Sequence, residues 1–389
     1  MAVPSMSRPL RIAQVAPPLE RVPPLAYGGT ERVMFELITE LDRRGHEVTT
    51  FASGDSEVPG RHVVTVAEAL RPAGDQGDPS GWFDVTTLAI LDRQDEFDLI
   101  HSHLEWASLV LARASRVPVV ATFHGRLDLP WSRDLLASPT PAHLVAISNA
   151  QASAHPEAAW TVVHNGLTLS GAPFERRRSE ALCFVGRVAP EKGIVDAIQI
   201  AQRAGRPLRI AAKIAPSGPE HDYHENVFLP ALEAAGPSVE FLGEISGEER
   251  DRLFAESYAA LMPGSWPEPF GLAAIEALAC GTPVLARRVG GLPEIIRDGI
   301  DGFFGDDITQ LAFHVPEVAS LDRRAIRRSV IDRFSTARMA DGYEALYRSI
   351  LARTASDGAP AAEAATNGTL PEPRVVAMAT LKSTPPKAG

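Results

Sequence analysis

The sequence predicts an α/β protein of two domains, each a parallel sheet with helices on its faces. Three observations support this prediction. The 389 residues exceed what one hydrophobic core usually supports. Short apolar runs alternate with stretches of helical periodicity in both halves, which is the order typical of parallel sheets. A polar bridge that contains proline and glycine, between Leu167 and Ser179, separates the two halves.

The first half opens in the order strand, helix, strand. The apolar run Leu10–Ala16 is expected to be a strand that feeds a loop. A helix should begin after Gly28 and Gly29, with Thr30 as its N-cap, because apolar residues recur at helical spacing from there. The next strand is expected at His46–Ala52. Further strands are predicted at residues 98–102, 117–123, 143–147 and 161–164.

The second half repeats this alternation. Strands are predicted at residues 181–185, 208–212, 239–242, 259–262 and 283–286, with helical stretches between them. After a last helical pattern, alanine, proline, threonine and glycine dominate the chain, a composition that buries little apolar surface. We therefore expect domains at residues 8–170 and 178–335, a helix at 336–353 that packs back across the cleft, and a disordered tail at 354–389.

Composition excludes several classes of protein. The formal net charge of −11 disfavours binding to nucleic acid, which depends on cationic contacts with phosphates. No apolar run approaches the ~20 residues that a membrane span requires, and the start of the chain lacks the order of a secretory signal. We therefore expect a cytoplasmic protein without a transmembrane segment. Cys183 and Cys280 lie in apolar segments, which argues against a disulfide framework.

The most informative stretch contains two acids and a glycine between them. Glu268 and Glu276 stand eight positions apart, and a helix should begin between them, so the two acids should have different tasks. Gly271, just before that helix, can bring backbone N–H groups to a phosphate. Glu276 lies about a turn inside the helix and can accept hydrogen bonds from sugar hydroxyls. Glu268 lies in the loop and can reach the sugar end of the same ligand.

A second stretch combines a strand, a glycine turn and two cations. Residues 184–193 carry Arg187 and Lys192 after the turn, an arrangement that suits a diphosphate. Arginine binds phosphate with a planar fork and lysine supplies a compact charge. The alternative for this segment alone is a solvated basic turn paired with Glu191.

These two stretches resemble the retaining glycosyltransferases of family 4, also called glycosyl transferases group 1, which include sucrose synthases, glycogen synthases and bacterial mannosyltransferases. The resemblance implies the GT-B architecture, in which two Rossmann-like domains face each other across a cleft. It also implies that Glu276 binds the nucleotide ribose and that Glu268 lies beside the donor sugar. Arg187 and Lys192 would then hold the donor phosphates without a metal.

The same resemblance extends to other positions. His124, at the end of a strand, is expected to contact the donor sugar and to join Glu268, Arg187 and Lys192 as a catalytic residue, although a lone histidine is usually structural. Glycine pairs and Asn-Gly sequences also occur as ordinary turns. Besides the two cations and Glu276, the donor-binding residues expected are Gly28, Gly29, Gly243, Ile245, Phe270, Gly271 and Leu272, and the acceptor or cleft residues are His103, Asn149 and Asn165.

A zinc site is the alternative for the segment that carries His101, His103 and Glu105, because alternating histidines and an acid can ligate that metal. No further ligand cluster is apparent in the sequence. We therefore expect no metal and no cofactor, and His103 is expected to face the acceptor.

The resemblance implies that a hexosyl group moves from a nucleoside diphosphate sugar to a hydroxyl acceptor with retained anomeric configuration. The acceptor could be a lipid, a glycan or a small metabolite. Three alternatives share this cleft: a sugar-nucleotide epimerase, a phosphorylase on the same fold, and a non-catalytic module that binds sugar nucleotides.

Overall fold

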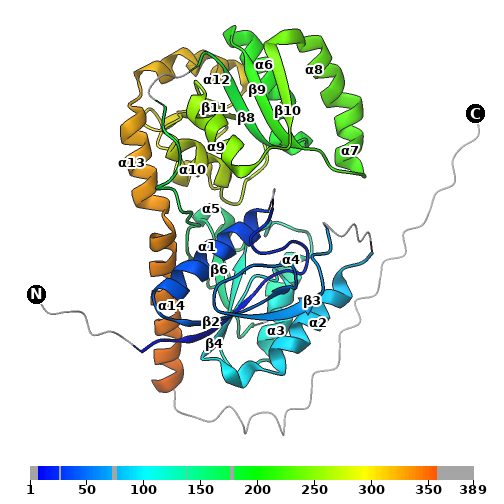
Figure 1. Ribbon diagram of the computed structural model, residues 1–389, viewed down its shortest axis with the longest axis vertical. Coiled ribbons are helices and arrows are strands. Elements are labelled where there is room, and N and C mark those ends of the chain that lie inside the picture. The colour runs from blue at the N-terminus through cyan, green and yellow to red at the C-terminus, as the bar shows by residue number, and fades with distance from the viewer. Residues whose placement is uncertain (1–7, 26–27, 72–76, 138, 176–178, 357–389) are drawn as a thin grey trace, which may run out of the picture.

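The structure, a computed structural model, describes residues 8–25, 28–71, 77–137, 139–175 and 179–356. It contains two parallel sheets with helices on their faces, one from each half of the chain, arranged end to end along the long axis (Figure 1). The predicted α/β class with two Rossmann-like units is confirmed. The predicted tail lies almost entirely outside the described residues.

The first sheet has the strand order β3-β2-β1-β4-β5-β6-β7, and every pair is parallel. The order reverses at β1, which pairs with β2 on one side and β4 on the other. Ligands of open α/β sheets bind beside such a reversal, at the carboxyl ends of the strands. The strands are β1 (Arg11–Val15), β2 (Glu47–Ser53), β3 (Arg61–Val66), β4 (Leu99–Ser102), β5 (Val119–Phe123), β6 (His143–Ala146) and β7 (Thr161–Val162).

Helices cover this sheet because their apolar residues recur at helical spacing. In α1, Val33, Leu37 and Leu41 lie in the core with at most 1% exposure. The prediction of Thr30 as N-cap is wrong: the helix begins at Gly29, so Thr30 already lies inside its first turn. The helices are α1 (Gly29–Arg43), α2 (Ser80–Leu91), η1 (Gln94–Glu96), α3 (Ala107–Ala114), α4 (Ser132–Leu136) and α5 (Asn149–Ala152).

The second sheet has the order β10-β9-β8-β11-β12-β13, again with parallel pairs. Both cysteines are buried and free. The strands are β8 (Leu182–Arg187), β9 (Leu208–Lys213), β10 (Val239–Gly243), β11 (Ala260–Met262), β12 (Val284–Ala286) and β13 (Gly302–Phe304). The helices are η2 (Pro190–Lys192), α6 (Ile194–Ala204), α7 (Pro219–Tyr223), η3 (His224–Phe228), α8 (Leu229–Ala235), η4 (Gly236–Ser238), α9 (Gly247–Glu256), α10 (Leu272–Ala279), α11 (Leu292–Ile295), α12 (Ile308–His314), η5 (Pro316–Ser320) and α13 (Arg323–Phe334).

The last helix, α14 (Thr336–Ser356), returns to the first half of the chain and lies beside α1 (Figure 1). The chain passes between the halves at Leu167 and again at Ser335, and these two segments are hydrogen-bonded side by side. Ion pairs then hold α14 to the first half, including Arg44 with Asp341 at 2.8 Å. The first domain is therefore completed by residues from the far end of the sequence.

Strands β3 and β13 were not predicted. β3 reads Arg-His-Val-Val-Thr-Val, a run rich in β-branched residues that fits an edge strand. β13 has only three residues and starts with Gly302, which gives almost no periodic signal. Among the described residues, no helix is both long enough and apolar enough to cross a membrane.

Candidate active site

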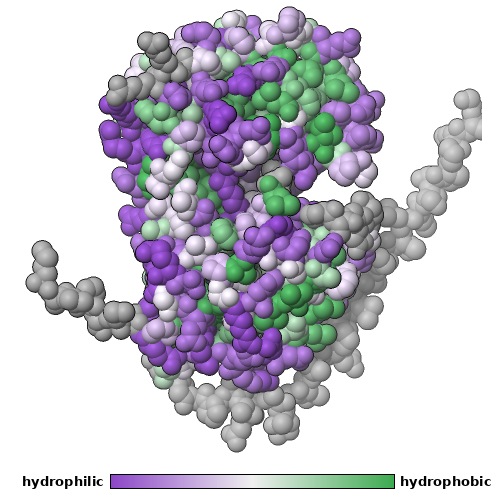
Figure 2. All heavy atoms as spheres, viewed as in Figure 1, coloured by the Kyte–Doolittle hydropathy of each residue, from purple (hydrophilic) through white to green (hydrophobic). Residues whose placement is uncertain are grey.

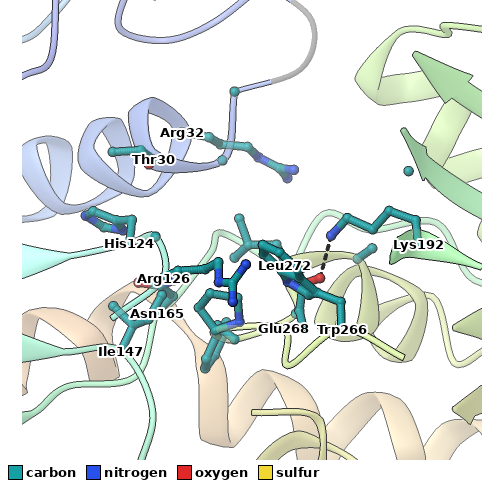
Figure 3. Close-up of a pocket in the computed structure, with 18 of the residues that line it drawn as sticks. Thr30, Arg32, His124, Arg126, Ile147, Asn165, Lys192, Trp266, Glu268 and Leu272 are labelled. Carbon is teal, nitrogen blue, oxygen red and sulfur yellow. Dashed lines mark hydrogen bonds and ion pairs between the residues drawn. The ribbon is translucent and has the colours of Figure 1, made fainter. Parts of the chain in front are cut away.

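A cavity of about 670 Å³ lies between the two halves of the chain. Loops at the carboxyl ends of both sheets line it, together with the first turns of α1 and α10. Figure 2 shows the surface notched between the two halves, and Figure 3 shows side chains from both halves pointing into the space between them. The two walls of this cavity differ in charge and in chemistry.

The start of α10 presents backbone to the cavity. Gly271 precedes the helix with φ 118°, a conformation that favours glycine, and a Cβ there would lie 2.7 Å from Leu292 Cδ2. Gly271, Leu272 and Ala273 all line the cavity. The first N–H groups of a helix have no partner within the helix, so this turn offers donors and the positive end of a helix dipole to an anion.

Beside this turn, Lys192 and Glu268 form an ion pair, drawn as a dashed line in Figure 3. Glycine packing fixes the backbone of the acid, because a Cβ on Gly290 would lie 2.2 Å from the carbonyl oxygen of Glu268. The N–H of Gly291 donates to that same oxygen at 2.8 Å. The loop that carries Glu268 is therefore held rigidly against the following glycine loop.

Glu276, one turn further into α10, is only 6% exposed. Its carboxylate pairs with Arg250 at 3.2 Å and, from the other half of the chain, with Arg32 of α1. Burial lowers the pKa of Arg32 to about 10, so the guanidinium remains charged at neutral pH. The acid expected to bind the ribose is thus paired with a cation from the opposite wall of the cavity.

Three predicted donor residues lie outside the lining. Arg187, at the end of β8, turns its guanidinium to Glu191 at 3.0 Å and to Glu220. Gly243 ends β10, the edge strand of the second sheet, and Ile245 follows it. Their roles in donor binding stay predictions.

The wall from the first half holds titratable groups with shifted pKa values. Burial lowers the pKa of His124 to about 4, so its ring is neutral at pH 7. Burial raises the pKa of Glu105 to about 7, although the N–H groups of His124 and Gly125 donate to its carboxylate at 2.9 and 3.1 Å. Burial likewise raises the pKa of Glu31 to about 7. Trp106 adds an aromatic ring to this wall.

Two residues expected in the cleft lie outside the lining of the cavity. His103 is 1% exposed, lies behind His124 with 2.8 Å between His103 Nδ1 and His124 Nε2, and does not line the cavity; its contact with the acceptor stays a prediction. The side chain of Asn149 donates to Glu294 at 2.7 Å and lies outside the cavity lining. Of the other predicted residues, the cavity is lined by Gly28, Gly29, His124, Asn165, Lys192, Glu268, Phe270, Gly271, Leu272 and Glu276.

Comparison with known proteins agrees with this arrangement. Residues 27–170 match the model of Glycosyltransferase Family 4, and residues 171–320 match that of Glycosyl transferases group 1. The D-inositol 3-phosphate glycosyltransferase of Mycobacterium sp. (strain KMS) is 33% identical over 369 residues, covering 79% of this chain and 82% of that protein. The chain belongs to glycosyltransferase family 4. As a glycosyltransferase it is an enzyme.

Other proteins resemble this family 4 glycosyltransferase over most of its length. Glycogen synthase of Mycobacterium tuberculosis (strain ATCC 25618 / H37Rv) is 28% identical, covering 79% of this chain and 86% of that protein. The crystal structure of AviGT4, a glycosyltransferase of avilamycin A biosynthesis, has a TM-score of 0.66 at 25% identity, covering 88% and 98% of the two chains. Anabaena HepE has a TM-score of 0.68 at 19% identity, covering 87% and 100%, and its GT-B fold is the same.

The two halves of this glycosyltransferase touch at several points beside the cavity. Glu294 of α11 accepts hydrogen bonds from the backbone N–H groups of Asn149 and Ala150 at 3.0 and 2.9 Å. These bonds, with the side chains of Asn149 and His164, hold the pKa of Glu294 at about 2 despite partial burial. Ser148 also donates to the carbonyl of Pro269 at 2.6 Å. The cavity therefore lies between walls that are already joined.

One group among the described residues could hold a metal ion. His221, His224 and Glu225 place ligand atoms within 4.8 Å of one another on the helices that follow β9. None of the three lines the cavity.

Several lining residues were not singled out from the sequence. Arg32 and Arg250 come from helices in different halves, so no local pattern predicts that both reach Glu276. Trp266 stacks under the guanidinium of Arg126 at 4.6 Å, again across the two halves. Glu105 was considered from the sequence only as a zinc ligand; in the structure it follows β4 with a φ of 50°, a sparsely populated conformation for a residue with a side chain.

Proposed function

We propose that this enzyme transfers a hexosyl group from a nucleoside diphosphate sugar to a hydroxyl acceptor with retention of configuration. The observation that carries the proposal is the wall formed by α10, where Glu268 and Glu276 flank an open helix turn and Lys192 stands beside it. Such a wall offers both the cation and the backbone donors that a diphosphate requires, with acids on either side for hydroxyl groups.

The donor binds side chains that form ion pairs with one another when no ligand is bound. Glu276 exchanges the guanidinium of Arg32 for ribose hydroxyls, and Glu268 turns to the hexosyl group. The diphosphate lies at the first turn of α10, where Lys192 meets its charge, with Arg187 released from its acids to assist. Lys192 exchanges a carboxylate for the anionic diphosphate, and Glu276 keeps Arg250 at 3.2 Å when ribose hydroxyls replace Arg32.

The chemical step breaks the bond between the anomeric carbon and the diphosphate oxygen, whose electron pair leaves with the diphosphate. The acceptor oxygen forms its new bond on the same face of the sugar, and its proton passes to an oxygen of the departing diphosphate. Lys192 and the start of α10 stabilise the charge that grows on this leaving group. His124 and Glu268 orient the hexosyl group. Because side chains and backbone meet the diphosphate, the reaction needs no metal.

Relatives guide the choice of donors to test. Anabaena HepE was solved with UDP and glucose, and the catalytic domain of Starch Synthase IV of Arabidopsis thaliana was solved with ADP and acarbose. The acceptor faces the other wall, where Trp106 and the weakly acidic Glu31 and Glu105 offer a ring surface and hydrogen-bonding groups for a hydroxylated molecule.

The test is calorimetric titration of the purified enzyme with UDP-, GDP- and ADP-sugars in the presence of a chelator, followed by an assay of nucleotide release. We expect one donor to bind and to release nucleotide when acceptor is added. Glu276→Gln should weaken donor binding about 10- to 100-fold, because a hydrogen-bonded charged group is removed. Glu268→Gln should instead lower kcat with a smaller change in binding.

The matched control is Glu248→Gln, which changes an 87% exposed acid of the same domain and should alter neither quantity. Binding of donor without release under every acceptor tried would favour a non-catalytic module. Loss of activity in chelator that added metal restores would refute the metal-independent mechanism, and an unchanged Glu276→Gln variant would remove the acid from the donor site.

A further inference from the structure

His124 ends a chain of buried polar side chains that starts on the C-terminal helix. His124 Nε2 lies 2.8 Å from His103 Nδ1, and His103 Nε2 lies 3.0 Å from Gln14 Oε1. Gln14 Nε2 lies 3.3 Å from His101 Nδ1, which also lies 2.6 Å from the hydroxyl of Tyr347. Gln14, His101, His103 and Tyr347 are each at most 1% exposed. The chain thus connects α14 to the cavity through the middle of the first sheet.

The orientation of the Gln14 amide defines the donor of each hydrogen bond in this chain. Its oxygen lies toward His103 and only accepts, so His103 carries its proton on Nε2. The Nδ1 atom of a neutral His103 then accepts, and the proton between it and His124 belongs to His124 Nε2. His124 Nδ1 is left with a lone pair. Among the hydrogen bonds of the described residues, none reaches that atom.

The three histidine rings are neutral, so each carries one proton, and the nitrogen that holds it decides which hydrogen bonds the ring can make. Burial lowers the pKa of His101 and His103 well below 6.5, and that of His124 to about 4. A neutral imidazole has one donor nitrogen and one acceptor nitrogen, and the bond at one nitrogen decides the role of the other. Reversal of the Gln14 amide would therefore reverse every link and place a proton on His124 Nδ1.

Tyr347 decides between the two orientations of the amide. A phenol is a stronger acid than an imidazole N–H, so across 2.6 Å Tyr347 donates to His101 Nδ1, while its oxygen accepts from the Gln14 amide at 3.5 Å. His101 Nε2 then donates to the hydroxyl of Thr122 at 2.7 Å. Beside an accepting nitrogen, the Gln14 amide is stable only with its NH₂ group toward His101 and its oxygen toward His103.

We propose that Tyr347 is a positioning residue that fixes His124 as the Nε2–H tautomer, so that its Nδ1 atom accepts a hydrogen bond from a hydroxyl of the bound substrate. The inference rests on the proposed function for the identity of that substrate. The tautomer itself is a property of the ligand-free enzyme. The C-terminal helix thereby sets the chemistry of a side chain in the cavity without touching the cavity.

The experiment is NMR of ¹⁵N-histidine-labelled, full-length enzyme without ligand, in which two-bond and three-bond ¹H–¹⁵N couplings report which ring nitrogen carries the proton. The signals of His124 are assigned by their loss in His124→Gln. We expect His124 to be the Nε2–H tautomer in the natural enzyme. In Tyr347→Phe we expect a population of the Nδ1–H tautomer to appear.

Tyr343→Phe is the matched control. Tyr343 lies one turn earlier on α14, is 1% exposed, and its hydroxyl contacts Thr122 at 3.0 Å. Loss of this hydroxyl removes the same group from the same helix but leaves Tyr347 beside His101. The tautomer of His124 should be unchanged in this variant. If Tyr347→Phe does not fold, Gln14→Leu, which removes the amide itself, should also produce a mixture of His124 tautomers.

An Nδ1–H tautomer in the natural enzyme would overturn the proposal, as would an unchanged tautomer in Tyr347→Phe or an equal change in Tyr343→Phe. With an active donor, Tyr347→Phe should lower kcat/KM about tenfold, the effect of one lost hydrogen bond, while Tyr343→Phe should not. An enzyme that binds no sugar nucleotide but shows these tautomers would refute the proposed function and keep this inference.

Discussion

The two walls of the cavity both bury polar groups, but they stabilise those groups in different ways. The wall from the second half contains charged side chains in pairs, such as Lys192 with Glu268. Glycines beside these pairs allow neighbouring backbone segments to pack closely. The wall from the first half keeps several titratable groups close to neutrality, with His124 uncharged and Glu31 and Glu105 only weakly acidic, although it also carries the charged Arg32. The second-half wall therefore holds mostly paired charges, and the first-half wall adds weakly charged hydrogen-bonding groups to the cation of Arg32.

The difference suits the two ends of a donor molecule. A diphosphate carries its charge throughout the reaction, so paired cations that can turn from an acid to a phosphate are appropriate. A sugar and a hydroxyl acceptor are neutral, and a buried unpaired charge beside them would be costly. Three substitutions test this contrast, two in the separate walls and one where the walls meet.

The largest effect is expected in the charged wall. Lys192→Met removes the cation beside the leaving diphosphate and leaves Glu268 without this partner. We expect kcat to fall about 10²- to 10³-fold, because a group that stabilises developing charge contributes on that scale. Single-turnover measurement of nucleotide release at saturating donor checks this. Lys213→Met, outside the lining, is the control, and an equal loss in that variant would mean that general positive charge, not Lys192, matters.

A smaller effect is expected in the neutral wall, and it depends on pH. The pKa of Glu31 is raised to about 7 by burial, and the charge of Glu20 adds to this, while a hydrogen bond from its own backbone and the charge of Arg71 oppose it. A raised carboxyl pKa contributes stability below pH 4.5 that is lost as pH rises through about 7. Glu31→Gln should therefore gain stability relative to the natural enzyme between pH 5 and 8, on the order of 2–3 kcal/mol.

Thermal or urea unfolding of both proteins across this pH range measures the difference. Glu47→Gln, at the exposed first position of β2, serves as the control, and its stability relative to the natural enzyme should not change across this pH range. If the gain of Glu31→Gln were the same at pH 5 as at pH 8, ionisation of Glu31 would not be its cause.

Much of this fold could be predicted because its signals are local. The periodicity of α1 and α10 and the apolar runs of the central strands depend only on neighbouring residues, and these elements lie where the sequence predicts them. The spacing of Glu268 and Glu276 across a helix start is also local, and both acids line the cavity. The same reasoning failed for Thr30, because α1 begins one residue earlier, at Gly29, with Gly28 packed closely against Pro24.

The rest of the site depends on contacts between distant parts of the chain. Arg32 reaches Glu276 across 244 positions, and Tyr347 reaches His101 across 246. His103 and Asn149 were expected in the cleft from the family resemblance, but the structure places His103 behind His124 and pairs Asn149 with Glu294 of the other half of the chain. Neither arrangement has a local sequence signal.

The smallest of the three effects is expected where the walls meet. Glu294→Gln keeps the size of the side chain but replaces one accepting oxygen with a donor that faces the N–H groups of Asn149 and Ala150. We expect the variant to be less stable by about 1 kcal/mol at pH 7, discounted because the site is partly exposed, and to bind donor more weakly because the halves are less firmly joined.

The pH dependence identifies the cause of that change. Because the pKa of Glu294 is lowered to about 2, its contribution is complete above pH 4.5 and is lost as the pH falls toward 2. Unfolding at pH 7, 5 and 3.5 should thus show a constant difference between the natural enzyme and Glu294→Gln at the first two values and a smaller one at the third. The exposed Glu248→Gln should match the natural enzyme throughout. A difference of the same size at pH 3.5 as at pH 7 would mean that Glu294 joins the two halves by packing and not by its charge.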